Sequence, residues 1–197
     1  MKKLISLIFL LSILTSCGAG IGTVKQFGTG VDISFDPRTV GMQIDDTLMQ
    51  KGLVTRLTLR ERKYFLSIQV EILDGRIFLT GKVDEPEEKI KITKLAWETK
   101  GVRSVENAIT IKGKSNFKKT AKDILITSQL RTALIFNRKT KSTNYTLETI
   151  NKNIYIFGIA MNEEEKKEVI EEANKIYDVG EIFPSIYLVS ELSRNKT

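Results

Sequence analysis

The sequence predicts an α+β protein built from two tandem copies of one small domain, each with the element order α-β-β-α-β. Two observations lead to this prediction. The sequence matches itself without a gap when it is shifted by 77 residues. Each copy also holds two segments with helical spacing and three segments with strand alternation, in the same order. We therefore expect a small three-stranded mixed sheet packed on two helices in each copy.

The repeat is established by residues that coincide at this one offset. Most of them are apolar or glycine: Leu48 with Leu125, Leu53 with Leu130, Leu57 with Leu134, Gly81 with Gly158, and Ala96 with Ala173. Because the offset holds across most of the chain, we place the first domain at 43–112 and the second at 120–190. A basic linker, 113–119, separates them, and 191–197 is expected to be a C-terminal tail.

In the first copy, apolar residues four positions apart predict a helix over 46–60. Residues 65–72 alternate between apolar and polar and predict a strand. The Asp74-Gly75 pair that follows is a strong hairpin signal, and it predicts a return strand over 76–82.

Asp84, as the cap, and Pro86 predict the start of the second helix of this copy. We expect this helix to carry Ile90 and Leu95, to place Trp97 in the core, and to stop before a third strand over 102–111.

The second copy repeats this order with weaker local signals. Its hairpin turn is Asn151-Lys152, and Asn162 is the expected cap of its second helix. Asp178 stands where the first copy has Gly101, a replacement that is tolerable because Asp accepts left-handed backbone better than most residues.

The N-terminus predicts a lipoprotein signal peptide over 1–16. Two lysines precede an apolar run, 4–14, which is too short to span a bilayer. Leu14-Thr15-Ser16-Cys17 resembles the lipobox of bacterial lipoproteins, which implies cleavage before Cys17 and acyl chains, palmitate among them, on that cysteine. Gly18, which follows, indicates an outer-membrane address. The alternative is an ordinary signal peptide, and 17–42 is expected to be a lipidated tether.

Composition limits the chemistry open to this chain. It contains no His and one Cys, which removes the commonest general base, the commonest metal ligand and any disulfide. We therefore expect no catalytic residue, cofactor or metal site. The formal charge of +7 points to an anionic partner. Nucleic acid is not expected, because the signal peptide directs the chain away from it and no aromatic residues alternate with the lysines.

A family resemblance rests on the glycine and apolar pattern of the first copy. The pattern consists of Val70, Ile72, Asp74-Gly75, Ile77, Leu79, Gly81, Gly101-Val102, Val105, Asn107 and Ile109. It resembles the BON domain (bacterial OsmY and nodulation). With the lipobox and the Asp36-Pro37-Arg38 segment, the chain resembles periplasm-facing lipoproteins with two BON domains. The resemblance implies a non-enzymatic, lipid-anchored outer-membrane protein. It also implies that the protein supports envelope integrity and binds anionic phospholipid through the first helix of the second domain.

That helix, predicted over 120–136, carries the candidate site. At 100° per residue, Ile126 and Leu130 lie on the core face, and Ile124, Arg131 and Ile135 lie on the opposite side. An outward apolar strip next to cations is suited to an anionic membrane surface. The predicted phospholipid-binding residues are Lys118, Lys119, Lys122, Ile124, Leu125, Ser128, Arg131, Ile135 and Phe136.

Two alternatives remain open for these features. Ile124 and Ile135 would instead pack against the first domain, with the lysines forming a solvated linker. The second alternative concerns the whole chain, which is then interpreted as a protein-interaction module that docks on outer-membrane assembly machinery or on a cell-wall factor. Gly81 and Gly158 are interpreted as structural glycines at tight strand exits rather than as ligand contacts.

Overall fold

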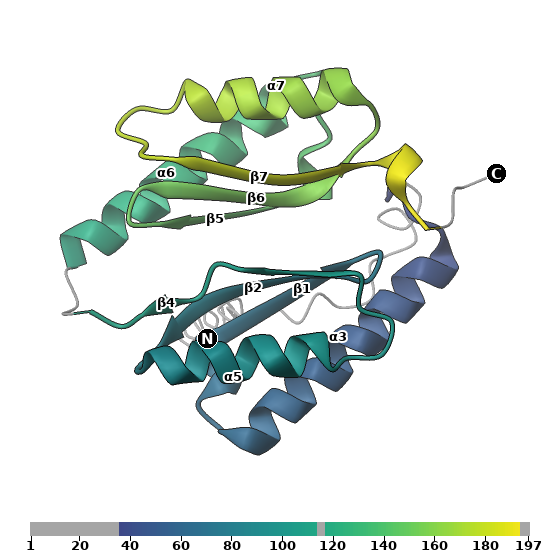
Figure 1. The fold of residues 1–197 in the computed structure, drawn as a ribbon. Coiled ribbons are helices and arrows are strands. Elements are labelled where there is room, and N and C mark those ends of the chain that lie inside the picture. Colours follow the sequence, from purple (N-terminus) through teal and green to yellow (C-terminus); the bar gives the residue numbers. More distant parts are fainter. Residues whose placement is uncertain (1–35, 114–116, 194–197) are drawn as a thin grey trace, which may run out of the picture. The chain divides into compact units, whose positions relative to one another are not determined.

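The computed structural model describes residues 36–113 and 117–193, all of which belong to one compact unit (Figure 1). The predicted signal peptide, Cys17 and the tether up to residue 35 lie outside the described residues, as do 114–116. Among the residues that the structure describes, no helix combines the length and the apolar content needed to cross a bilayer.

The first repeat forms a mixed sheet covered by helices. Its elements are α3 (Val40–Arg60), α4 (Tyr64–Ser67), β1 (Ile68–Leu73), β2 (Arg76–Val83), α5 (Pro86–Trp97), β3 (Ser104–Asn107) and β4 (Thr110–Ile111). Strand β2 pairs with β1 in antiparallel register and with β3 and β4 in parallel register. The predicted third strand is therefore divided in two. The break lies where the Asn107 side chain accepts a hydrogen bond from the backbone N–H of Ile109 at 2.9 Å.

The second repeat has the same plan with an undivided third strand. Its elements are α6 (Phe117–Phe136), the 3-10 turn η2 (Ser142–Asn144), β5 (Tyr145–Ile150), β6 (Asn153–Ala160), α7 (Glu163–Asn174), β7 (Ile182–Leu188) and η3 (Val189–Glu191). Strand β6 is central, antiparallel to β5 and parallel to β7. The predicted mixed sheet of three strands is confirmed in this repeat.

Both predicted hairpin turns are present, and each has two residues with positive φ. Asp74 and Gly75 have φ of 52° and 71°, and Asn151 and Lys152 have φ of 52° and 69°. Two successive positive φ values are typical of the tight turn whose twist matches that of the strands. Asp178 also takes a left-handed φ, 62°, as expected for the residue that replaces a glycine.

Two predicted helix starts are wrong. α3 begins at Val40, inside the predicted tether, and the side chain of Thr39 caps it by accepting from the N–H of Met42. The cap of α5 is Glu85, not Asp84: the Glu88 side chain accepts from the backbone N–H of Glu85 at 3.0 Å, and the N–H of Glu88 donates to the Glu85 carbonyl at 3.1 Å. The Asn162 cap of α7 is confirmed, since its side chain accepts from the N–H of Glu165 at 2.9 Å.

Each repeat has its own core between its helices and one face of its sheet. In the first repeat, Ile92 and Ala96 of α5 are buried against Leu53 of α3. The expectation that Trp97 lies in this core is wrong, because its side chain is 53% exposed and that of Ile90 is 69% exposed. The core face of α5 is thus on the opposite side of the helix from these two residues.

The other faces of the two sheets meet each other. Phe78 of β2, Ile150 of β5 and Phe157 of β6 form a separate buried cluster with Ala108. A smaller cluster joins Met42, Ile159 and Leu192. Leu192, the second residue of the predicted C-terminal tail, is therefore buried against α3 and β6.

Candidate membrane-contact helix

The outward side of α6 carries a strip of exposed apolar side chains. Ile124 and Ile135, on one line along the helix, are 62% and 60% exposed. Leu125 and Phe136 flank this line and are also exposed. The strip runs about 16 Å from Ile124 to Ile135, since a helix rises about 1.5 Å per residue. The opposite side of α6 packs on the core of the second repeat, where Ile126, Leu130 and Leu134 are buried.

The basic residues predicted for this site are not equally placed. Arg131 is exposed and stands seven residues after Ile124, so it belongs to the outward line together with Ser128. Lys119 is exposed but lies about 140° around the helix from Ile124. Lys122 donates to the carboxylate of Asp178 at 2.9 Å within its own repeat. The side chain of Lys118 lies outside the described residues. Arg131 is therefore the predicted cation best placed beside the apolar strip.

A groove of about 260 Å³ lies beside the N-terminal half of this strip. It is lined by Ile124, by Glu148 of β5, and by Gly81 and Lys82 of the first repeat, among others. Burial raises the pKa of the Glu148 carboxyl, the negative charge of Asp123 raises it further, and Lys82 opposes both. Ile124 thus borders the first repeat while most of its side chain faces solvent.

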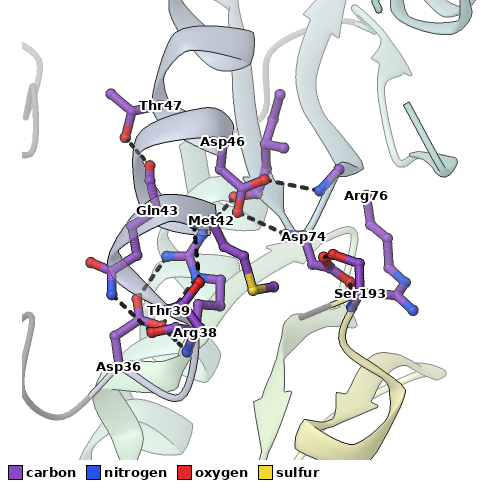
Figure 2. Close-up of polar contacts among 12 residues, drawn as sticks. Asp36, Arg38, Thr39, Met42, Gln43, Asp46, Thr47, Asp74, Arg76 and Ser193 are labelled. Carbon is purple, nitrogen blue, oxygen red and sulfur yellow. Dashed lines mark hydrogen bonds and ion pairs between the residues drawn. The ribbon is translucent and has the colours of Figure 1, made fainter. Parts of the chain in front are cut away.

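A second polar feature is a buried carboxylate that holds the first hairpin turn (Figure 2). The carboxylate of Asp46, on α3, accepts hydrogen bonds from the backbone N–H groups of Asp74 at 2.7 Å and Gly75 at 2.9 Å. Arg38 donates to the same carboxylate at 2.5 Å and is held in turn by Asp36. Burial raises the pKa of Asp46, against the lowering effects of the Gly75 N–H and of Arg38. The segment before α3 is thus fixed to the turn.

The neighbouring carboxylate of Asp74 links this turn to the end of the chain. It pairs with Arg76 at 2.7 Å and with Arg103. It also accepts from the backbone N–H of Ser193 at 3.0 Å and from the Ser193 hydroxyl. Arg76 further donates to the carbonyl of Glu191 and lies 4.1 Å from the ring centre of Tyr187. Figure 2 shows Ser193 beside Asp74, so the residues after β7 are anchored to the first repeat.

The second repeat uses the same device at the equivalent position. Asp123 of α6 accepts from the backbone N–H groups of Asn151 at 3.0 Å and Lys152 at 2.8 Å. Sequence reasoning did not identify these carboxylates. The signal was present, because Asp46 and Asp123 coincide at the 77-residue offset. Both are structural: each satisfies two backbone donors of a turn.

The two predicted structural glycines occupy places where a side chain would collide with backbone. A Cβ on Gly81 would meet the carbonyl oxygen of Ser67, and the φ of Gly81 is +124°. A Cβ on Gly158 would meet the ring of Tyr145 and lie 2.5 Å from the carbonyl oxygen of Asn144. Both glycines permit close approach of the segment that enters the first strand. Within the described ranges, no group of three or more His, Cys, Asp or Glu side chains is arranged to hold a metal ion.

The fold defines this chain as a tandem pair of small α+β domains. Comparison with known protein families identifies the domain family. The chain belongs to the BON domain family: the family model matches residues 53–113 and again 122–183. The α+β prediction with two tandem BON domains is thereby confirmed.

Three relatives are similar in sequence to this chain, each over more than half of both sequences. An "uncharacterized protein in gshII 5′region" of Anaplasma centrale is 29% identical, over 78% of this chain and 95% of its own length. The outer membrane lipoprotein DolP of Haemophilus influenzae is 26% identical, over 80% of this chain and 81% of its own. A 21 kDa hemolysin of Actinobacillus pleuropneumoniae is 25% identical, over 62% of this chain and 64% of its own.

Proposed function

We propose that this protein is a lipoprotein of the cell envelope that contacts anionic phospholipid through the outward side of α6. In this proposal, acyl chains on Cys17 anchor it to the outer membrane, with both BON domains facing the periplasm. Its contact with lipid supports the integrity of the envelope. The similarity to an outer membrane lipoprotein across most of both chains supports the location.

The exposure of Ile124 and Ile135 is the observation that favours lipid contact. Both side chains remain more than half exposed although the first repeat lies close to Ile124. Fully burying one such side chain contributes about 1.5–3 kcal/mol of free energy. Several exposed isoleucine and leucine side chains on one side of a helix therefore indicate a binding surface that covers them. Arg131 on the same line adds about 1 kcal/mol at an anionic surface. This pairing of an apolar strip with a cation suits the interface of a charged bilayer.

Individually weak contacts are sufficient for an anchored protein. Acyl chains on Cys17 would hold the domains near the bilayer at all times, so that α6 acts at high effective concentration. Binding by α6 then sets the orientation of the domains rather than their attachment.

The second candidate is a protein-docking module, and the groove beside Ile124 favours it. The groove combines an apolar rim with the partly buried Glu148 carboxyl and the ammonium of Lys82. A flat bilayer surface would not fill such a groove, whereas a side chain of a partner protein would bind in it.

Vesicle flotation separates the two candidates. The mature chain with Cys17→Ser, which no acyl chain can modify, is mixed with vesicles of phosphatidylglycerol and phosphatidylcholine, or of phosphatidylcholine alone. We expect flotation only with the anionic vesicles, weakened at high salt. Ile124→Glu with Ile135→Glu should reduce it at least tenfold.

Leu59→Glu with Leu66→Glu is the matched control, because both are exposed apolar side chains that lie outside α6. It should leave flotation unchanged. Equal flotation with both kinds of vesicle, or full flotation of the α6 double variant, would contradict lipid contact through α6.

A further inference from the structure

Helix α5 of the first repeat has a second exposed strip, unlike that of α6 because it contains the only tryptophan of the chain. Ile90 and Trp97 are seven residues apart and lie on one line of the helix, 69% and 53% exposed. Lys94 stands between them, one turn from each, and is exposed. The strip therefore alternates apolar, basic and aromatic side chains along the outer side of α5.

The exposed lysines on α5 and directly after it are not engaged by neighbouring carboxylates. Lys91, Lys94 and Lys100 are exposed, and within the described part of the chain none of them forms an ion pair. Of the exposed acids here, Glu98 is paired with Arg56 at 3.0 Å. Glu87 lies at the N-terminal end of the strip, beyond Ile90. The region from Ile90 to Lys100 therefore presents positive charge beside its apolar side chains.

The fold itself does not require these apolar side chains. At the 77-residue offset, Ile90 and Trp97 correspond to Lys167 and Asn174 of α7. α7 buries its core face with Val169 and Ala173, as α5 does with Ile92 and Ala96. None of the large exposed apolar side chains lies on α7. One repeat thus keeps a polar outer side at this position, while the other exposes a tryptophan and an isoleucine.

We propose that the outer strip of α5 is a second contact site for an anionic phospholipid bilayer. Tryptophan is amphipathic and prefers the headgroup level, and lysines beside it match the negative surface charge. A solvated helix would gain nothing from Ile90 and Trp97, whereas a bilayer interface would bury both of them.

The position of α5 in the chain supports a bilayer as the occupant. This inference rests on the proposed anchor at Cys17. Asp36 follows Cys17 by 19 positions, which limits their separation to at most about 65 Å. The first repeat, which begins directly after Asp36, is therefore within reach of the membrane that the anchor enters. The bilayer is therefore available for contact with α5 without a partner protein.

Trp97 reports on this site directly, since no other tryptophan contributes to the emission. The mature chain with Cys17→Ser is titrated with phosphatidylglycerol vesicles, with and without brominated acyl chains, and with phosphatidylcholine vesicles. We expect a blue shift of the Trp97 emission and quenching by the brominated lipid, both confined to the anionic vesicles.

Two variants assign the response to α5. Lys91→Glu with Lys94→Glu should weaken the Trp97 response at least tenfold, because each lysine near an anionic surface contributes about fivefold. Since both lysines are exposed, the circular dichroism spectrum should not change. Lys167→Glu, on the equivalent turn of α7, is the matched control and should leave the response intact.

Failure of this inference is distinguishable from failure of the α6 proposal. If anionic vesicles float the protein while Trp97 is neither shifted nor quenched, the α5 site is wrong and α6 contact is unaffected. An equal Trp97 response with phosphatidylcholine vesicles would also overturn it. If the Ile124→Glu with Ile135→Glu variant keeps both flotation and the Trp97 response, the α6 site is wrong and the α5 site stands.

Discussion

Phe78 of β2 and Phe157 of β6 stack with ring centroids 5.0 Å apart and planes inclined by 19°. Both rings are buried, and Tyr187 meets the ring of Phe157 edge-on. A small domain of about 70 residues buries a marginal core when it is alone. This stack adds a third core between the two repeats, so the stability of each should depend on the other.

Removing the ring of Phe157 should therefore be costly. We expect Phe157→Ala to lower the free energy of unfolding by about 3–5 kcal/mol, because it leaves a large cavity in a closed site. In a double-mutant cycle with Phe78→Ala, the coupling energy should be about 0.5–1.5 kcal/mol. Urea unfolding measures both. Additive effects of the two substitutions would contradict a stabilising stack.

Substitutions at three glycines should have different effects on the stability of the protein. Gly158→Val should unfold the second repeat, because its branched side chain would enter the space of Tyr145 and the Asn144 carbonyl. Gly81→Ala should be strongly destabilising in the first repeat, where φ is also positive. Gly52→Ala, on α3 with open space around it, should instead stabilise the protein by about 1 kcal/mol. Thermal unfolding followed by circular dichroism tests all three, and an unchanged melting curve for Gly158→Val would contradict the structural role.

The two turn-holding carboxylates should differ in their contribution to stability. Asp46 is buried and accepts from two backbone donors and from Arg38. Asp46→Ala should cost about 3–5 kcal/mol, since it leaves two buried backbone donors unsatisfied and removes one of the two carboxylates that pair with Arg38. The equivalent Asp123→Ala should cost only about 1 kcal/mol, because its bonds lie nearer to solvent. Chemical denaturation of the two variants compares them, and equal losses would contradict the role of burial.

Glu88 should make stability depend on pH in the acidic range. Its carboxylate accepts from the Lys63 ammonium at 2.6 Å, from the Tyr64 hydroxyl and from the N–H groups of Asp84 and Glu85. The hydrogen bond from Lys63, more than the others, lowers the pKa of Glu88 to about 2. A carboxyl whose pKa is lower in the folded state stabilises the fold above its unfolded pKa of about 4.3. This contribution is lost as pH falls from about 4 to about 2.

Glu88→Gln tests this dependence. The variant should be less stable than the parent at pH 7 and should lose less stability on acidification below pH 4. Glu87→Gln, on the exposed side of the same turn, should leave the profile unchanged. Parallel profiles for Glu88→Gln and the parent protein would show that another group is responsible.

Local sequence determined the order of the main helices and strands of this protein and its division into repeats. Hairpin geometry at Asp74-Gly75 and at Asn151-Lys152 depends on the φ values that those residues accept, which is a property of a few neighbouring atoms. The buried side of α6 likewise follows from periodicity, and Ile126 and Leu130 lie where it placed them. The exposure of Ile124 and Ile135 agrees with the same periodicity, although periodicity did not exclude contact with the first repeat.

Only the tertiary structure decided how these elements meet. A strand pattern states that Phe78 lies on the side of β2 opposite Ile77, but not that Phe157 of the other repeat covers it. Apolar neighbours at helical spacing predicted a core position for Trp97, whereas the phase of α5 buries Ile92 and Ala96 instead. Contacts such as Ser193 with Asp74 join residues more than a hundred positions apart. Local preference cannot specify such pairings, because they depend on shape and burial across the whole unit.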